Sequence, residues 1–127
     1  MSNANHARRF MMIGALLVAL ATIVGAFGAH ALKTRLPVDR YEVLQTAVHY
    51  QFFHALGLLA IGLILERRPT RALLIAGWLI VAGVALFSGS LYAIIAGAPT
   101  TVGVLTPIGG VCLISAWLLA AWSLFRP

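Results

Sequence analysis

The sequence predicts an all-α fold, an integral membrane bundle of four transmembrane helices in a single domain that covers residues 1–127. Three observations support this prediction. Hydrophobic residues make up 61% of the chain and charged residues only 9%, whereas soluble domains carry about 25% charged residues. The mean hydropathy is +0.98. The uncharged stretches reach the length of about 20 residues that one helix needs to cross the hydrocarbon core.

The first predicted span covers residues 10–30. It follows Arg8 and Arg9, and the next charged residue is Lys33. The basic pair, the apolar run and the small residues around His30 also resemble a cleavable signal peptide, but the apolar region of a signal peptide usually covers about 7–15 residues. A retained helix is therefore favoured, and the other three spans stay in the membrane under either interpretation.

The second predicted span covers residues 46–65, and its helix is expected to start earlier, near Pro37. Proline is favoured in the first turn of a helix. Asp39 and Glu42 would then lie near the positive end of the helix dipole. A helix from about residue 37 to residue 66 would place its first turns at the membrane surface.

The third and fourth predicted spans cover residues 72–96 and 103–125. No charged residue lies between Arg71 and Arg126, and this stretch is far too long for one crossing at about 1.5 Å per residue. Glycine, proline and threonine cluster at residues 96–101, which is typical of a turn.

Small residues recur at four-residue spacing in three of the spans. Such repeats predict faces where helices approach each other closely. The three repeats are Ala21, Gly25 and Ala29; Gly89, Ala93 and Gly97; and Ala116 and Ala120.

The distribution of lysine and arginine predicts that both termini are cytoplasmic. Six basic residues share a side with the termini, namely Arg8, Arg9, Arg67, Arg68, Arg71 and Arg126. Three lie on the other side, namely Lys33, Arg35 and Arg40. Because the side richer in basic residues usually faces the cytoplasm, we expect a multi-pass membrane protein with this orientation.

Polar residues at membrane depth are the first place to look for a functional site. The candidates would form a polar pocket in the outer half of the bundle: His30, Tyr50, Gln51, His54, Ser88, Ser90, Tyr92 and Thr106. Such a pocket could bind a ligand, relay a proton or coordinate a metal. The alternative is that these side chains only hydrogen-bond between helices, and this alternative is favoured because the second span contains no carboxylate.

No catalytic site, metal or cofactor is predicted. His49 and His54 are five positions apart and do not share a helix face. A pair formed by His30 and His54 would leave zinc short of its usual protein ligands. The sequence contains no nucleotide-binding glycine loop, no HExxH and no Gly-x-Ser-x-Gly motif. Its basic residues lie beside apolar runs, which argues against nucleic-acid binding.

Four motifs occur in order along the chain: GAFGAH at residues 25–30, YQFFHAL at 50–56, LFSGSLY at 86–92 and TPIGG at 106–110. In these motifs the sequence resembles the YgdD-like family of small bacterial inner-membrane proteins, also described as domain of unknown function 423. The resemblance implies a four-helix protein of the bacterial plasma membrane without a defined activity. It maps the family's recurring polar positions onto His30, Tyr50, His54, Ser88, Ser90, Tyr92, Thr106 and Pro107.

Two hypotheses of function follow from the sequence. The first is a non-enzymatic scaffold or accessory subunit of a membrane complex, because the sequence shows no set of residues arranged for catalysis. Its partners would be the lipid bilayer and another membrane protein, or a second copy of itself in a homo-oligomer. The alternative is a small-solute or proton-conducting helical bundle that uses His30, Tyr50 and His54.

Overall fold

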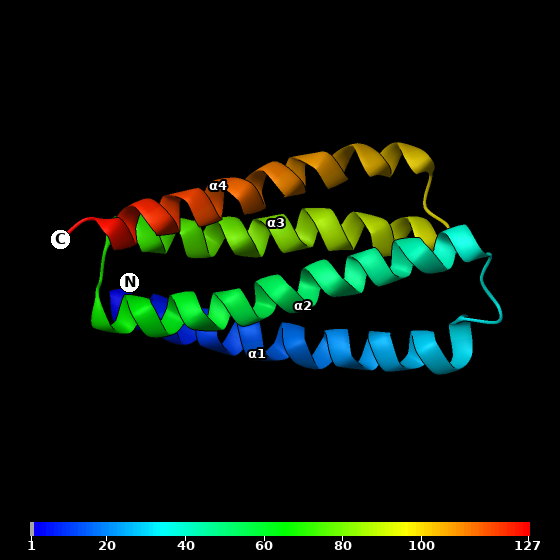
Figure 1. Ribbon diagram of the computed structural model, residues 1–127, viewed down its shortest axis with the longest axis horizontal. Coiled ribbons are helices and arrows are strands. Elements are labelled where there is room, and N and C mark those ends of the chain that lie inside the picture. Colours follow the sequence, from blue (N-terminus) through cyan, green and yellow to red (C-terminus); the bar gives the residue numbers. More distant parts are fainter. Residues whose placement is uncertain (1) are drawn as a thin grey trace.

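A computed structural model describes residues 2–127 and shows four long helices joined by short connections (Figure 1). Helix α1 comprises Asn3–Phe27 and continues as a π-helical segment, Gly28–Leu32. Helix α2 comprises Val38–Arg67, and α3 comprises Arg71–Ile95. A 3₁₀ segment, Thr100–Val104, leads into α4, Leu105–Phe125. All four helices are long and apolar enough to cross a membrane, which confirms the predicted fold class.

Local hydrogen bonds explain where two of the helices begin. The side chain of Ser2 accepts a 3.3 Å hydrogen bond from the backbone N–H of Asn5, so α1 starts well before the first predicted span. The side chain of Thr70 accepts a 3.2 Å hydrogen bond from the backbone N–H of Leu73 at the start of α3. In both cases the cap satisfies an amide that has no partner within the helix.

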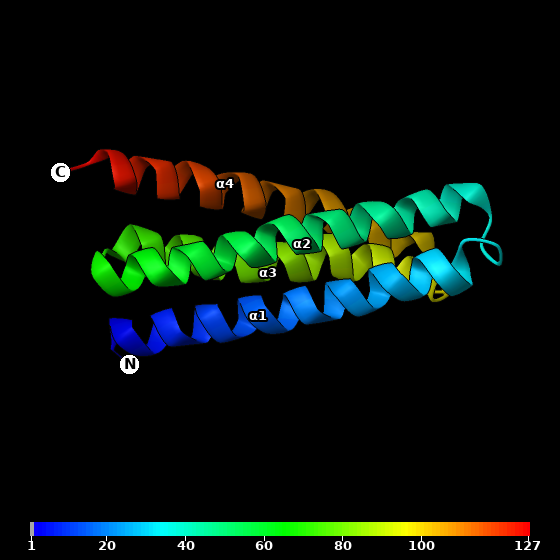
Figure 2. The same ribbon diagram turned by 60° about the horizontal axis from the view of Figure 1, so that its bottom comes forward.

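Consecutive helices run antiparallel, and α2 and α3 lie in the middle of the bundle (Figures 1 and 2). Helix α1 packs along α2, α4 packs along α3, and α2 packs against α3, whereas the backbones of α1 and α3 approach each other at only a few positions. The two central helices therefore bury much more of their surface than α1 and α4 do.

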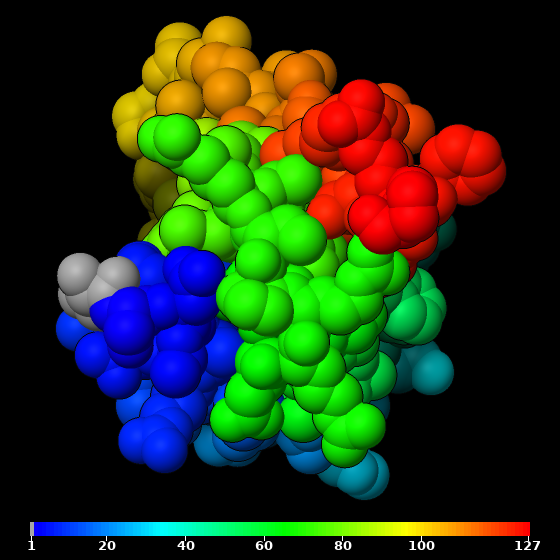
Figure 3. Space-filling view, turned by 90° about the vertical axis from the view of Figure 1, so that its left-hand side faces the viewer, coloured from blue at the N-terminus to red at the C-terminus, as the bar shows by residue number. Residues whose placement is uncertain are grey.

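One end of the bundle holds both termini and the connection between α2 and α3. In the view onto this end, the N-terminal part of the chain and the C-terminus lie on either side of that connection (Figure 3). The opposite end holds the two remaining connections (Figure 1). The orientation prediction assumed the same grouping of loops and termini.

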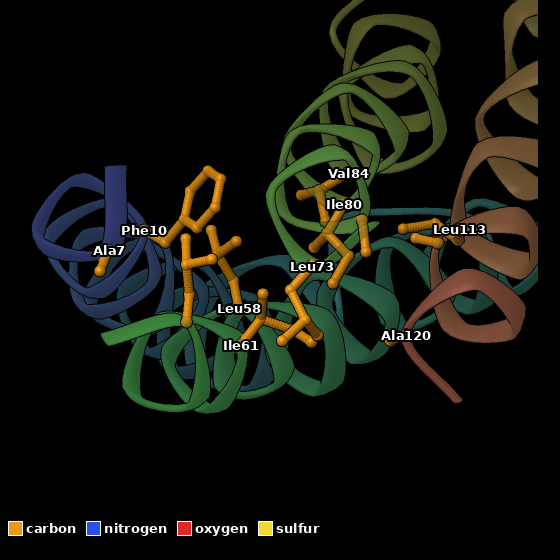
Figure 4. Close-up of a cluster of buried hydrophobic side chains, with 12 residues drawn as sticks. Ala7, Phe10, Leu58, Ile61, Leu73, Ile80, Val84, Leu113 and Ala120 are labelled. Carbon is orange, nitrogen blue, oxygen red and sulfur yellow. The ribbon is translucent and has the colours of Figure 1, made fainter. Parts of the chain in front are cut away.

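The hydrophobic core is concentrated toward the end that holds the termini (Figure 4). Phe10 of α1, Leu58 of α2 and Ile80 of α3 are fully buried there. The ring of Phe10 lies over Gly77, where any added Cβ would collide with it, and it meets Trp78 edge-on with 5.1 Å between the ring centroids. Because Gly77 has no side chain, the core has room for the ring of Phe10.

Glycine allows close backbone contacts between α1 and α2 and between α3 and α4. A Cβ added at Gly14 of α1 would lie 2.8 Å from the carbonyl oxygen of Ala55 on α2. A Cβ added at Gly109 of α4 would lie 2.5 Å from the backbone nitrogen of Phe87 and 2.9 Å from the carbonyl oxygen of Gly83 on α3. Neither position has room for a side chain.

The predicted contact face at Gly89 and Gly97 is wrong. A Cβ added at either glycine would meet nothing within 4 Å. Gly89 follows Gly83 by six positions, which rotates it by about 240° around the helix, so it faces away from the contact with α4. Gly97 has a φ of +108° and forms part of the turn after α3, a backbone conformation that glycine adopts at no steric cost. Ala21, Ala116 and Ala120 of the other repeats are buried.

Candidate functional site

Gln51 of α2 connects three helices. Its side chain is 4% exposed. Its Nε2 donates a 2.8 Å hydrogen bond to the carbonyl oxygen of Leu17 on α1, and its Oε1 accepts a 2.7 Å hydrogen bond from the hydroxyl of Tyr92 on α3. One turn before Tyr92, the Ser88 hydroxyl donates a 2.7 Å hydrogen bond to the carbonyl oxygen of Ala47 on α2. Gln51, Ser88 and Tyr92 therefore form one polar group among three helices.

Ser90 and Thr106 form a second polar group, between α3 and α4. Their hydroxyl oxygens are 2.6 Å apart. The Ser90 hydroxyl also donates a 2.9 Å hydrogen bond to the carbonyl oxygen of Phe87 in its own helix. A hydroxyl carries one proton, so the Thr106 hydroxyl is the donor to Ser90.

Tyr50 and His54 lie on a different side of α2 from Gln51, in an aromatic group. The ring of Tyr50 stacks on Phe87 of α3 with 4.1 Å between centroids, and the His54 ring stacks on Tyr50 at 5.8 Å. The His54 Nδ1 lies 2.7 Å from the carbonyl oxygen of Tyr50. A carbonyl oxygen can only accept, so Nδ1 is the donor. Trp117 of α4 faces His54 at 6.3 Å and closes this group from the other side.

His30 lies in the π-helical segment at the end of α1 and is exposed. Gly28 lies opposite Leu44 and Gly25 lies opposite Val48 in the α1–α2 contact. Continuing this antiparallel register sets His30 level with residue 42 of α2, about twelve positions or 18 Å along the axis from His54. The eight predicted residues therefore occupy four separate places and not one pocket.

A groove of about 390 Å³ lies between α1 and α3. Its walls are apolar side chains of α1 and α3, and Gln51 is the one residue of α2 that lines it. The lining consists of Ile13, Leu17, Leu20, Val24, Gln51, Val81, Val84, Ala85, Ser88, Gly89 and Tyr92. A smaller groove of about 200 Å³ lies on the α4 side, next to Tyr50, His54, Phe87, Gly110 and Trp117.

Neither groove contains a charged side chain. Among residues 2–127, no three His, Cys, Asp or Glu side chains lie close enough together to hold a metal ion. The arrangement can therefore offer hydrogen bonds and apolar surface to a neighbour or a ligand.

Two contacts of the site could not be predicted from the sequence. The partner of Gln51 is the backbone carbonyl of Leu17, which carries no side-chain signal. Trp117 reaches α2 because Gly57 leaves space for its ring, and a Cβ at Gly57 would collide with it. The aromatic content of YQFFHAL and LFSGSLY was the available signal for the Tyr50–Phe87 stack.

Four apolar helices of spanning length with small-residue contacts and interhelical hydrogen bonds define the class of small helical-bundle membrane proteins. Residues 24–110 match the family model described as "Protein of unknown function (DUF423)". The chain belongs to this family.

Relatives support the same assignment over almost the full length. The chain is 39% identical over 111 residues to the UPF0382 membrane protein YwdK of Bacillus subtilis, which covers 87% of this chain and 90% of the relative. It is 40% identical over 117 residues to a UPF0382 membrane protein of Staphylococcus saprophyticus, with coverage of 92% and 97%. No solved structure matches the chain significantly.

Proposed function

We propose that the protein is a non-enzymatic scaffold or accessory subunit of a complex in the cell inner membrane, with both termini in the cytoplasm. One observation carries this proposal. In residues 2–127 every buried side-chain nitrogen and oxygen has a hydrogen-bond partner, and the polar groups described above bond within and between helices. The polar side chains that bond between helices, those of Gln51, Ser88, Ser90, Tyr92 and Thr106, therefore hold the bundle together.

The conducting-bundle alternative has less support. A solute or proton path needs polar groups in sequence along the membrane axis. Instead, Gln51 bonds to Tyr92, and Ser90 bonds to Thr106. Fully buried apolar residues such as Leu58 fill the core between these groups and the end of the bundle that holds the termini.

The peripheral helices supply the surface that an accessory subunit would use. On α4, Ile114 and Leu118 are 63% and 68% exposed, and on α1, Ile23 is 64% exposed. Faces of this kind contact either lipid or another membrane protein. The proposal assigns at least one of them to a protein partner.

Photo-crosslinking in native membranes tests this assignment. A photoreactive amino acid would replace Leu118 of α4 or Ile23 of α1, with Leu63 of the central helix α2 (54% exposed) as the matched control. We expect one of the two peripheral positions to give a discrete protein adduct and a particle larger than the monomer on a native gel. Lipid adducts at all three positions together with a monomeric particle would contradict the proposal.

A further inference from the structure

We propose that the groove between α1 and α3 binds a neutral amphiphile dissolved in the bilayer, a hydrocarbon chain that carries one small uncharged carbonyl or hydroxyl group. This inference goes beyond the accessory role, because it concerns a ligand site and not the outer faces of α1 and α4. Four features of the groove support this: its size, the direction in which it opens, the polar atoms on its floor, and the depth of these atoms in the membrane.

The groove is long and narrow. Along α1 it extends from Ile13 to Val24, which at 1.5 Å per residue is about 17 Å. A helix with its side chains is about 10–12 Å across and would occupy at least about 1,300 Å³ over that length, several times the volume of about 390 Å³ that the groove offers. A partner helix would therefore not enter, whereas a single chain of carbon atoms with contact distances of about 4 Å fits.

The groove opens toward the lipid. It lies between two membrane-spanning helices whose backbones approach each other at only a few positions, and its walls are formed by residues such as Leu20, Val81 and Ala85. Molecules that reach it must therefore arrive from the hydrocarbon phase. A Cβ at Gly89 would meet nothing within 4 Å, so this wall has free space that the protein's own packing does not use.

Polar atoms on the floor retain unused hydrogen-bonding capacity. The Gln51 side-chain amide has two N–H donors, and one of them bonds to the Leu17 carbonyl. The Tyr92 hydroxyl donates its single proton to Gln51, which leaves its oxygen lone pairs free to accept. Among residues 2–127, one donor of Gln51 and the acceptor sites of Tyr92 thus have no protein partner, and both residues line the groove.

The depth of these atoms favours a molecule whose polar group enters the membrane. Leu17, which accepts from Gln51, lies at the middle of the helical segment Asn3–Leu32. The hydrocarbon core is about 30 Å thick, so the site lies on the order of 15 Å below the headgroups. Without a charged side chain in the lining, a phosphate would have no partner there. Isoprenoid alcohols and isoprenoid ketones share the required chemistry.

Binding to the purified full-length protein in detergent tests the proposal. The probes are an isoprenoid methyl ketone, the corresponding isoprenoid alcohol, an isoprenoid hydrocarbon without a polar group, and a phospholipid. Gly89→Phe would fill the groove. The matched control is Gly110→Phe in the α4-side groove, where an added Cβ would be 3.9 Å from the nearest atom, the Cδ2 of Phe87. Ala85→Leu would fill the same wall as Gly89→Phe and replaces it if that variant does not fold.

We expect the ketone, the alcohol or both to bind saturably, with affinity lowered about tenfold or more by Gly89→Phe and changed less than about twofold by Gly110→Phe. Tyr92→Phe should weaken the polar probes and leave the affinity for the hydrocarbon unchanged, which a purely structural role of Tyr92 would not do. Equal loss in both phenylalanine variants, no saturable binding, hydrocarbon binding as tight as that of the polar probes, or competition by phospholipid alone would overturn the proposal.

Discussion

At the scale of single residues, Gln51 shows how one side chain can organise a membrane bundle. Its amide donates to α1 and accepts from α3, so both of its polar atoms are used across helix boundaries. Interhelical hydrogen bonds in membranes contribute only about 0.6 kcal/mol each on average. Their value here is in setting the register of three helices at once.

Replacing Gln51 with leucine should lower the free energy of unfolding by about 0.6–1.7 kcal/mol, because Tyr92 loses its acceptor and α1 loses a donor. The measurement is unfolding in mixed micelles titrated with SDS. Gln45→Leu is the control, since Gln45 is exposed and its amide makes one weak 3.4 Å contact with Tyr41. A double-mutant cycle with Tyr92→Phe should give a positive coupling energy, and additive effects would show that the bond is unimportant.

Two adjacent glycines on α4 should respond differently to substitution by alanine. Gly109→Ala is expected to destabilise the protein by about 1–3 kcal/mol, because the new Cβ would lie 2.5 Å from the backbone nitrogen of Phe87. Gly110→Ala has its nearest neighbour at 3.9 Å and should be neutral or slightly stabilising through helix propensity. Equal unfolding free energies for the two variants would refute the close contact of α3 with α4.

At the scale of helices, two kinds of contact divide the molecule into two hairpins. Within each hairpin, glycine brings backbones together, as Gly14 does against Ala55 and Gly109 against Phe87. Between the hairpins, side chains make the contacts: Tyr92 bonds to Gln51, and Trp117 packs onto Gly57. Hydropathy and charge predicted where each helix lies in the sequence. They did not predict which face of each helix contacts a neighbour, because small residues recur at four-residue spacing on several faces of an all-apolar helix.

Thr70 acts at a helix boundary and across helices. It caps α3 and its hydroxyl also lies 2.8 Å from the Ser123 hydroxyl on α4. Thr70→Ala should therefore cost about 1–2 kcal/mol of unfolding free energy, and Ser123→Ala, which removes only the second bond, should cost less. Thr70→Ser keeps the hydroxyl and should stay close to the wild type. If Ser123→Ala had the larger effect, the cap would not contribute as described.

At the scale of the whole molecule, the sequence predicted the number of helices and their order, because these depend on the length of apolar runs that the bilayer thickness requires. It did not predict that the eight polar residues separate into four places. Adjacent residues such as Tyr50 and Gln51 point about 100° apart. Which neighbour each of them meets depends on the packing of all four helices. Backbone acceptors such as the Leu17 carbonyl cannot be recognised from the sequence, because every residue type carries one.

The predicted orientation can be measured with single cysteines in a background where Cys112 is replaced by alanine. Thr34→Cys lies in the connection between α1 and α2, and Ser2→Cys and Pro69→Cys lie at the opposite end of the bundle. We expect a membrane-impermeant thiol reagent to label the first in intact cells and the other two only after permeabilisation. The reverse pattern would place the six arginines outside and contradict the positive-inside assignment.

The short connection at Arg68–Thr70 has a consequence for how the chain is made. Helices α1 and α2 share a close backbone contact at Gly14, and α3 and α4 share one at Gly109. A nascent chain can thus complete the first hairpin before the second has left the ribosome. If the chain were divided at Pro69 and both halves were expressed in the same cell, each half could form its own hairpin. The two hairpins would then assemble through Gln51, Tyr92 and Trp117.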